Sequence, residues 1–354
     1  MYRFCILGML IGLLLVPSDV PWLKDIQLAP PSRPPLPRSI SPLMMKTDFE
    51  SPDALKLWEQ RREILREAWQ EVLGPKPRKP KSTDFEVLQI DQLDHCTRKL
   101  IRYENEIGEF LNAYLLEPTE QVAARPAVVA LHATTNHTNK TIAGIGGSHD
   151  EQIGLRLAQQ GFIVICPENF LWRGAKGYPE AVKVFQEKYP DSLGMRKMLF
   201  DAERAVDIVA ALPNVDPKKI GAVGHSLGAK EVLYLTAFDE RISVAVFSEG
   251  GIELESTNWQ APWYLGPVVL DPKFPRNHHE LIALIAPRPF LVLGGETEGA
   301  SDGARSWPYI EAAMPVYKLY SDTPRIGLLN HRQGHTISDK SFERLAEWLE
   351  CYLK

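Results

Sequence analysis

The sequence predicts an α/β fold with a mostly parallel central sheet and helices on both faces. The chain has 354 residues, of which 44% are hydrophobic and 24% charged, so it holds enough apolar material for one large core. From residue 127 onward, short apolar runs alternate with segments of helical periodicity. Strands that are apolar throughout are typical of parallel sheets whose two faces are both covered.

The N-terminus divides into two short segments. In residues 1–18, Arg3 precedes an uncharged apolar run, 4–16, that is too short to span a membrane but fits the core of a secretory signal peptide. We therefore expect an exported protein, periplasmic or extracellular, with no stable membrane span once the signal is removed. Residues 19–50 are rich in proline, which fixes φ and lacks an N–H, so they are predicted to form an extended linker.

The main domain is expected over residues 51–354. It begins with a helix that Ser51-Pro52-Asp53 opens and Gly74-Pro75 ends. Residues 82–118 alternate in polarity and predict leading antiparallel strands. The later apolar runs, each a predicted strand, are 127–131, 162–166, 220–223, 244–247, 290–293 and 326–329. Helical patterns lie between or after them, near 151–160, 196–212, 227–238, 277–285, 307–318 and 338–352.

Residues 250–276 interrupt this alternation. They follow a predicted strand and carry several aromatic residues, including Trp259 and Trp263. Open α/β sheets bind ligands at the carboxyl ends of their strands, so this insertion is expected near the active site as a lid or as a wall of the pocket. Anchoring of a long loop by these aromatic residues is the alternative interpretation.

The strongest motif is Gly224-His225-Ser226-Leu227-Gly228. It directly follows the predicted strand 220–223 and precedes a helical pattern. A nucleophile elbow needs this context, because the serine sits in a sharp turn whose flanking residues must be small. The helix that follows favours a developing negative charge at its N-terminus. Ser226 is therefore predicted to be a nucleophile.

A serine nucleophile needs a base, and His335 is the preferred candidate. It follows the last predicted strand and precedes the final helix, the position at which this fold carries its histidine. His331 is the rival in the same loop, but Gly334 gives the backbone conformational freedom directly before His335.

The acid that orients the histidine has three candidates. Asp302 is ranked first because it lies after the strand 290–293, before a glycine and just ahead of a predicted helix. Glu298 lies in the same loop at a shorter offset from the strand. Glu249 lies at the tip of the preceding strand, from which some hydrolases of this fold take their acid.

Two backbone amides are expected to stabilise the oxyanion. One is the N–H of Leu227, and the other comes from the loop after 127–131, with Thr134 or Thr135 as donor. None of the remaining histidines has the H-E-x-x-H spacing of a helical zinc site, so neither a metal nor another cofactor is predicted.

These motifs together resemble the dienelactone-hydrolase-like and acetyl-xylan-esterase-like branch of the α/β-hydrolases. Besides the elbow, the resemblance rests on Trp58 with Arg61-Arg62, on Leu131-His132, on Ala286-Pro287-Arg288-Pro289-Phe290 and on Gly334-His335, and it covers about residues 50–354. It implies carboxylic-ester hydrolysis, including esters on polysaccharides, where Trp259 and Trp263 could stack on sugars.

A more distant likeness is to glucuronoyl esterases. They carry a glutamate after the strand that follows the elbow helix, as Glu249 does here, and a lysine four residues after the serine, as Lys230 does here. They also have an arginine directly after the nucleophile, where this chain has Leu227. That departure separates the chain from the glucuronoyl esterase pattern.

The sequence therefore predicts acyl transfer to water, with a small-molecule or carbohydrate ester as substrate. A net charge of −5 without long runs of one sign argues against nucleic acid as a partner. The alternatives are a serine peptidase of the prolyl-oligopeptidase type and a non-catalytic binding protein on a hydrolase scaffold. The first usually adds a large N-terminal propeller, and the second would be expected to have lost part of its triad.

Overall fold

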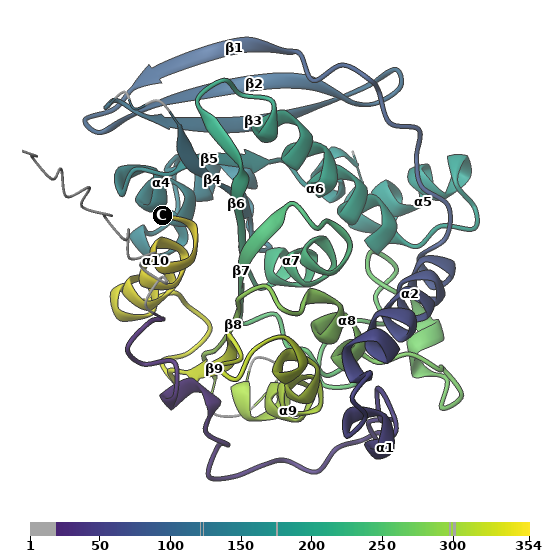
Figure 1. Cartoon of the computed structure of the whole chain (residues 1–354). Coiled ribbons are helices and arrows are strands. Elements are labelled where there is room, and N and C mark those ends of the chain that lie inside the picture. The colour runs from purple at the N-terminus through teal and green to yellow at the C-terminus, as the bar shows by residue number, and fades with distance from the viewer. Residues whose placement is uncertain (1–18, 121, 123, 175, 297–298, 300–301) are drawn as a thin grey trace, which may run out of the picture.

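A nine-stranded sheet forms the centre of the computed structural model, which describes residues 19–354 except 121, 123, 175, 297–298 and 300–301 (Figure 1). The strand order across the sheet is β1-β2-β3-β5-β4-β6-β7-β8-β9. The strands are β1 (Phe85–Gln92), β2 (Cys96–Glu106), β3 (Glu109–Pro118), β4 (Arg125–Leu131), β5 (Ile163–Pro167), β6 (Val215–His225), β7 (Ile242–Ser248), β8 (Phe290–Gly294) and β9 (Ile326–Asn330). The predicted signal peptide, residues 1–18, lies outside the described residues.

The sheet has an antiparallel and a parallel part. Strands β1, β2 and β3 pair antiparallel with one another, and β3 pairs antiparallel with β5. Strands β5, β4, β6, β7, β8 and β9 run parallel. This arrangement confirms the predicted α/β-hydrolase fold, with its leading antiparallel strands and its parallel remainder. The parallel strands are almost wholly buried because helices cover both faces, as their continuous apolar runs predicted.

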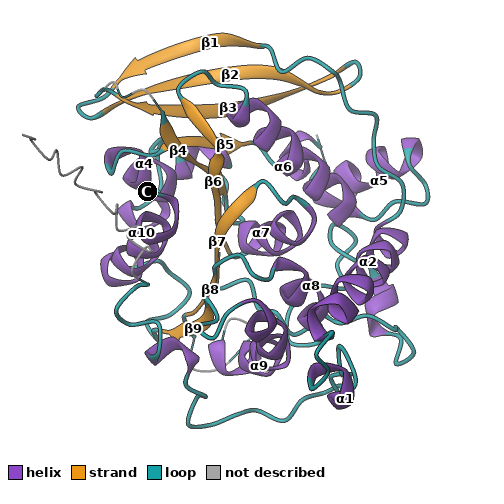
Figure 2. Cartoon of the chain, viewed as in Figure 1, coloured by secondary structure: helices purple, strands orange, loops and turns teal. Residues whose placement is uncertain are grey.

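Helices cover the sheet in two layers (Figures 1 and 2). On one face, α2, α6, α7, α8 and α9 enclose the larger core cluster, and on the other α4 and α10 enclose the smaller one. The helices are α1 (Lys46–Phe49), α2 (Ala54–Leu73), α3 (Asn139–Ile142), α4 (Ile153–Gln159), α5 (Tyr178–Lys188), α6 (Gly194–Ala210), α7 (Leu227–Phe238), α8 (His278–Ile285), α9 (Gly303–Tyr320) and α10 (Asp339–Leu353). Short 3₁₀ helices are η1 (Asp25–Gln27), η2 (His149–Glu151), η3 (Phe170–Arg173) and η4 (Pro267–Leu270).

The proline-rich segment 19–50 packs on the domain. The Trp22 ring lies 5.8 Å from the ring of Trp348 on α10, and its Nε1 donates to a carboxylate oxygen of Glu347 at 2.7 Å. Farther along, the Arg38 guanidinium donates to the carbonyl of Val269 at 3.0 Å. The segment contains η1 and α1 as well as extended backbone, and its apolar side chains reach both cores.

No helix among the described residues is both long and apolar enough to span a membrane.

Candidate active site

Ser226 occupies a strained turn between β6 and α7. Its φ is +56°, in the left-handed region that side chains rarely adopt. A Cβ on Gly224 would lie 2.2 Å from the carbonyl oxygen of Gly228, and a Cβ on Gly228 would lie 2.1 Å from that of Leu131. Both positions therefore require glycine, and the two glycines allow β6, α7 and β4 to approach closely enough to form the turn.

The N-terminus of α7 lies directly behind the serine. Leu227 is the first residue of this buried helix, so its backbone N–H belongs to the first turn and has no acceptor within the helix. The Ser226 N–H is already used, because it donates to the carbonyl of Ser248 at the end of β7, 2.8 Å away. The helix end thus offers the Leu227 amide and the positive end of its dipole to an anion beside Ser226.

Glu249, at the tip of β7, holds both histidines of the C-terminal loop. One carboxylate oxygen lies 2.8 Å from Nε2 of His331, and the other lies 3.3 Å from Nδ1 of His335. The Glu249 side chain is 0% exposed, and its φ is +59°. Burial alone would raise the pKa of this carboxyl, but the contacts with His331 and His335 outweigh burial and lower it. Glu249 is therefore held as a carboxylate.

Gly295, just after β8, leaves room for this arrangement. A Cβ there would lie 2.1 Å from the carbonyl oxygen of Gly334 and 2.6 Å from the carboxyl carbon of Glu249. The Gly334 N–H in turn donates to the carbonyl of Gly295 at 2.8 Å. The histidine loop therefore lies directly on the ends of β7 and β8, and it brings His335 to Glu249.

The structure places the candidate acids in different surroundings. Asp302, ranked first from the sequence, is the N-cap of α9, and its Oδ1 accepts the Ala304 N–H at 2.9 Å. The carboxylate beside His335 is that of Glu249, which was the second choice. The third choice, Glu298, lies outside the described residues.

His225, the residue before the nucleophile, adds a third ring to the site. Its centroid lies 4.7 Å from that of His335, and its Nδ1 lies 3.3 Å from Oγ of Ser248. Burial lowers the pKa of His225 to about 4, although the Glu249 carboxylate opposes this shift. His225 is therefore neutral at neutral pH and packs against the imidazole of His335.

Ser226 and His335 line a common cavity of about 300 Å³. Thr134 and Thr135, the residues considered as the second oxyanion donor, line the same cavity. Its far wall, which the sequence did not predict, comes from α3, η2 and the start of α4. The complete lining is Ala133, Thr134, Thr135, Thr141, Ile142, Ser148, Asp150, Glu151, Ile153, His225, Ser226, His335, Thr336 and Ile337.

The insertion 250–276 contributes none of these described lining residues, and Trp259 is not available for stacking on a sugar. The Trp259 side chain is fully buried, its Nε1 donates to the carbonyl of Gly251 at 2.9 Å, and the Nζ of Lys230 lies 4.0 Å from its ring centroid. The prediction for Trp259 is therefore wrong, since it anchors the loop to the body. Trp263 is half-buried, with its ring 5.7 Å from that of Tyr178.

Among the residues that the structure describes, two groups of side chains have a spacing that could hold a metal ion. In the first, ligand atoms of His225, Glu249 and His335 all lie within 4.8 Å of one another. The second, formed by His149, Asp150 and Asp339, is more exposed. In the first group, Glu249 also contacts His335 as the acid of a catalytic triad would contact its base. The geometry of this group is therefore compatible with either role and does not indicate a metal ion.

The elbow, the Glu249–His335 contact and the sheet topology have the arrangement of an α/β-hydrolase site. Residues 111–284 match the Dienelactone hydrolase family, which belongs to the branch that the sequence resembles.

Individual related proteins and solved structures share only low sequence identity with this chain. YtaP of Bacillus subtilis, named as a hydrolase, is 24% identical over 67% of this chain and 80% of its own length. Among solved structures, a glucuronoyl esterase from Solibacter usitatus matches with a TM-score of 0.71 at 17% identity, covering 90% of this chain and 99% of its own. Methylesterase BT1017 matches with a TM-score of 0.64 at 18% identity, over 85% of this chain and 65% of its own. At such identities these structures establish the shared fold.

Proposed function

We propose that the chain hydrolyses a carboxylic ester through an acyl-enzyme on Ser226. The observation that carries this proposal is the contact between Glu249 and Nδ1 of His335, 3.3 Å apart, beside a cavity that His335 and Ser226 both line. With Nδ1 turned to the carboxylate, Nε2 of His335 is the nitrogen that can accept the serine proton.

The reaction would proceed in two half-reactions. Oγ of Ser226 attacks the ester carbonyl as its proton passes to Nε2 of His335, and the oxyanion accepts hydrogen bonds from the N–H of Leu227 and from one amide in 133–135. The intermediate then expels the alcohol, which takes the proton from His335. Water next attacks the acyl-enzyme and gives a proton to the same nitrogen, which returns it to Ser226 as the acid leaves. Glu249 stabilises the imidazolium in both halves, and the scheme uses no cofactor.

The lining of the cavity favours an uncharged, hydroxyl-bearing substrate. Besides that of Ser226, five hydroxyl groups line it, those of Thr134, Thr135, Thr141, Ser148 and Thr336. The described lining also contains the carboxylates of Asp150 and Glu151 but neither lysine nor arginine. An anionic substrate would meet like charges there, whereas a sugar could exchange hydrogen bonds with the hydroxyl groups. We therefore propose an ester on a carbohydrate, and Trp263 remains a proposed stacking residue.

Labelling with a fluorophosphonate probe tests the nucleophile. Because segment 19–50 packs on the domain, the chain from residue 19 should be used, with the labelled residue mapped by mass spectrometry and turnover followed on p-nitrophenyl acetate. We expect the label on Ser226 and ester turnover, and neither in Ser226→Ala. A folded chain that takes no label would contradict the proposal and favour a binding protein on this scaffold.

Export is proposed on the sequence of residues 1–18 alone. N-terminal sequencing of the protein recovered from the periplasm or medium should start near residue 19. Recovery of the full chain from the cytoplasm would contradict export without affecting the proposed chemistry.

A further inference from the structure

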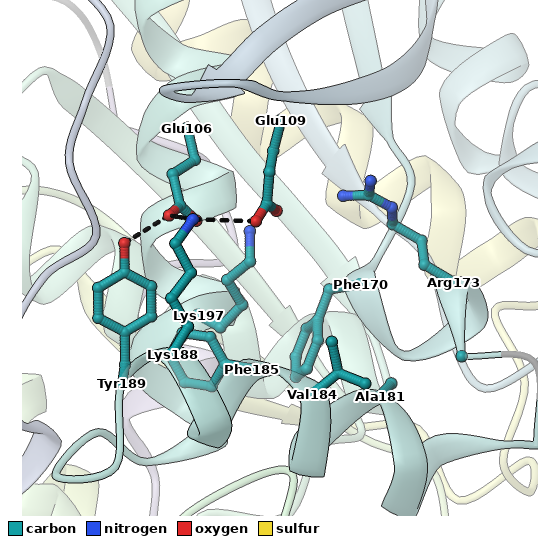
Figure 3. A pocket seen from close by; sticks show the side chains of 11 residues that line it. Glu106, Glu109, Phe170, Arg173, Ala181, Val184, Phe185, Lys188, Tyr189 and Lys197 are labelled. Atoms are coloured by element: carbon teal, nitrogen blue, oxygen red, sulfur yellow. Dashed lines mark hydrogen bonds and ion pairs between the residues drawn. The ribbon is translucent and has the colours of Figure 1, made fainter.

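A second cavity, of about 310 Å³, shares no lining residue with the cavity of Ser226 (Figure 3). Four elements enclose it, namely the turn between β2 and β3, the 3₁₀ helix η3, one face of α5 and the start of α6. Its lining residues are Glu106, Glu109, Phe170, Arg173, Gly174, Ala181, Val184, Phe185, Lys188, Tyr189 and Lys197. The proposed ester hydrolysis uses none of them.

The cavity has an apolar side and a charged side, which Figure 3 shows facing each other. The apolar side consists of Phe170, Ala181, Val184 and Phe185, with the two phenylalanine rings 6.1 Å apart. Val184 is 59% exposed. The charged ends of Glu106, Glu109, Lys188, Lys197 and Arg173 gather along the other side. Such a cavity suits a ligand that has an apolar body and one charged group.

Most of these charges are already paired. Lys188 pairs with both carboxylates, that of Glu106 and that of Glu109, the latter at 3.0 Å, and Tyr189 donates its hydroxyl to Glu106. Lys197 pairs with Asp201, which is not among the lining residues.

Arg173 differs from the other charged groups. Within the described part of the chain, its guanidinium lies within ion-pairing distance of no carboxylate, and the side chain is exposed. Its positive charge still reaches Glu109. Burial would raise the pKa of that carboxyl, but Lys188, Lys197 and Arg173 together lower it. Arg173 is therefore the lining cation that pairs with no described carboxylate, and we expect an anionic ligand group at that end of the cavity.

We propose that this cavity binds a small organic carboxylate, with its apolar body against Phe170 and Phe185 and its carboxylate on Arg173. A guanidinium offers two parallel N–H donors, which match the two oxygens of a carboxylate. At about 30 Å³ for each water, the cavity has the volume of roughly ten water molecules, enough for a ring-sized acid. This binding does not depend on the proposed ester hydrolysis.

Three ligands of the same shape and different charge test the inference. Benzoate, benzyl alcohol and benzylamine are titrated into the chain from residue 19, with binding followed by calorimetry. We expect benzoate to bind with a Kd of about 1 mM or tighter, benzyl alcohol at least about tenfold more weakly, and benzylamine more weakly still. Equal binding of benzoate and benzyl alcohol, tighter binding of benzylamine, or no saturable binding of benzoate would overturn the proposal.

Variants of exposed residues locate the binding. Arg173→Gln should weaken benzoate binding about tenfold or more, whereas Lys176→Gln, which removes a charge nearby without altering the lining, should leave it unchanged. Val184→Asp should abolish binding, because it places a carboxylate on the apolar side. Benzoate bound in the cavity of Ser226 would not respond to Arg173→Gln, so an unchanged Kd in that variant would also overturn the inference.

Discussion

The substitution Glu249→Gln tests the proposed acid with little change of shape. The side chain is fully buried, and its two oxygens serve His331 at 2.8 Å and His335 at 3.3 Å. Glutamine keeps one acceptor and replaces the other with an amide donor, so one histidine loses its acceptor and the imidazolium loses its counter-charge. The loss of one contact to a charged group, at about 1.5–3 kcal/mol, corresponds to a fall in kcat of about 10–10²-fold.

The assay is steady-state hydrolysis of p-nitrophenyl acetate by Glu249→Gln and by a matched control, Asp302→Asn. Asparagine caps helices as well as aspartate does, so the control keeps the N-cap of α9 and removes only the charge. We expect the control to keep kcat within about threefold, a change of about 0.6 kcal/mol in the barrier. A 10²-fold loss in Asp302→Asn beside an active Glu249→Gln would refute the assignment.

Three further perturbations follow from the structure. His331→Ala should lower kcat about 10–100-fold with little change in KM, because the side chain positions Glu249 without touching substrate; an unchanged kcat would show that His331 is dispensable. Gly228→Ala should lower the free energy of unfolding by about 2–3 kcal/mol or more in urea titrations, since its Cβ would lie 2.1 Å from the carbonyl oxygen of Leu131; wild-type stability would contradict the close packing of the elbow. Burial lowers the pKa of His278 to about 3, so between pH 6.5 and about 3 the unfolded chain binds a proton that the native chain does not. Stability should fall as the pH drops through this window, and His278→Gln should reduce that slope near pH 5 by about 1.4 kcal/mol per pH unit; an unchanged slope would contradict a neutral buried imidazole.

The fold and two members of the proposed triad could be predicted because their signals are local. Apolar runs of strand length, followed by helical periodicity, specify a covered parallel sheet wherever they occur. Ser226 is recognised from the glycines that its turn requires, and His335 from its place after the last strand. Neither inference needs the distance between two remote segments.

The acid, the cavity wall and the aromatic residues depend on such distances. Asp302 and Glu249 both lie near strand ends, and the choice between them depends on which carboxyl faces the histidine loop. That direction is set by the positive φ of Glu249 and by the space that Gly295 leaves, neither of which the sequence near the triad reveals. Tryptophan is a residue type that can stack on sugars, but the Trp259 ring packs on Lys230 inside the protein. Sequence patterns cannot distinguish an inward from an outward aromatic residue in an irregular loop.

Strained backbone conformations are concentrated around the proposed active site. Among the described residues, the non-glycine residues with positive φ are Thr138, Ser226, Glu249 and Arg332. Ser226 and Glu249 are the proposed nucleophile and acid, Thr138 lies between cavity-lining residues, and Arg332 directly follows His331. Each such conformation costs of order 1–3 kcal/mol and persists only where its surroundings enforce it.

Backbone hydrogen bonds between strand ends provide that enforcement. The Ser226 N–H donates to Ser248 at the end of β7, the Glu249 N–H to Leu293 in β8, and the His331 N–H to Gly294, which ends β8. The ends of β6, β7, β8 and β9 are thus fixed to one another, and they carry the nucleophile, the acid and the loop of the base. Because the strain lies at the proposed catalytic residues while these bonds hold it in place, the sheet is built to present Ser226, Glu249 and His335 in one fixed geometry.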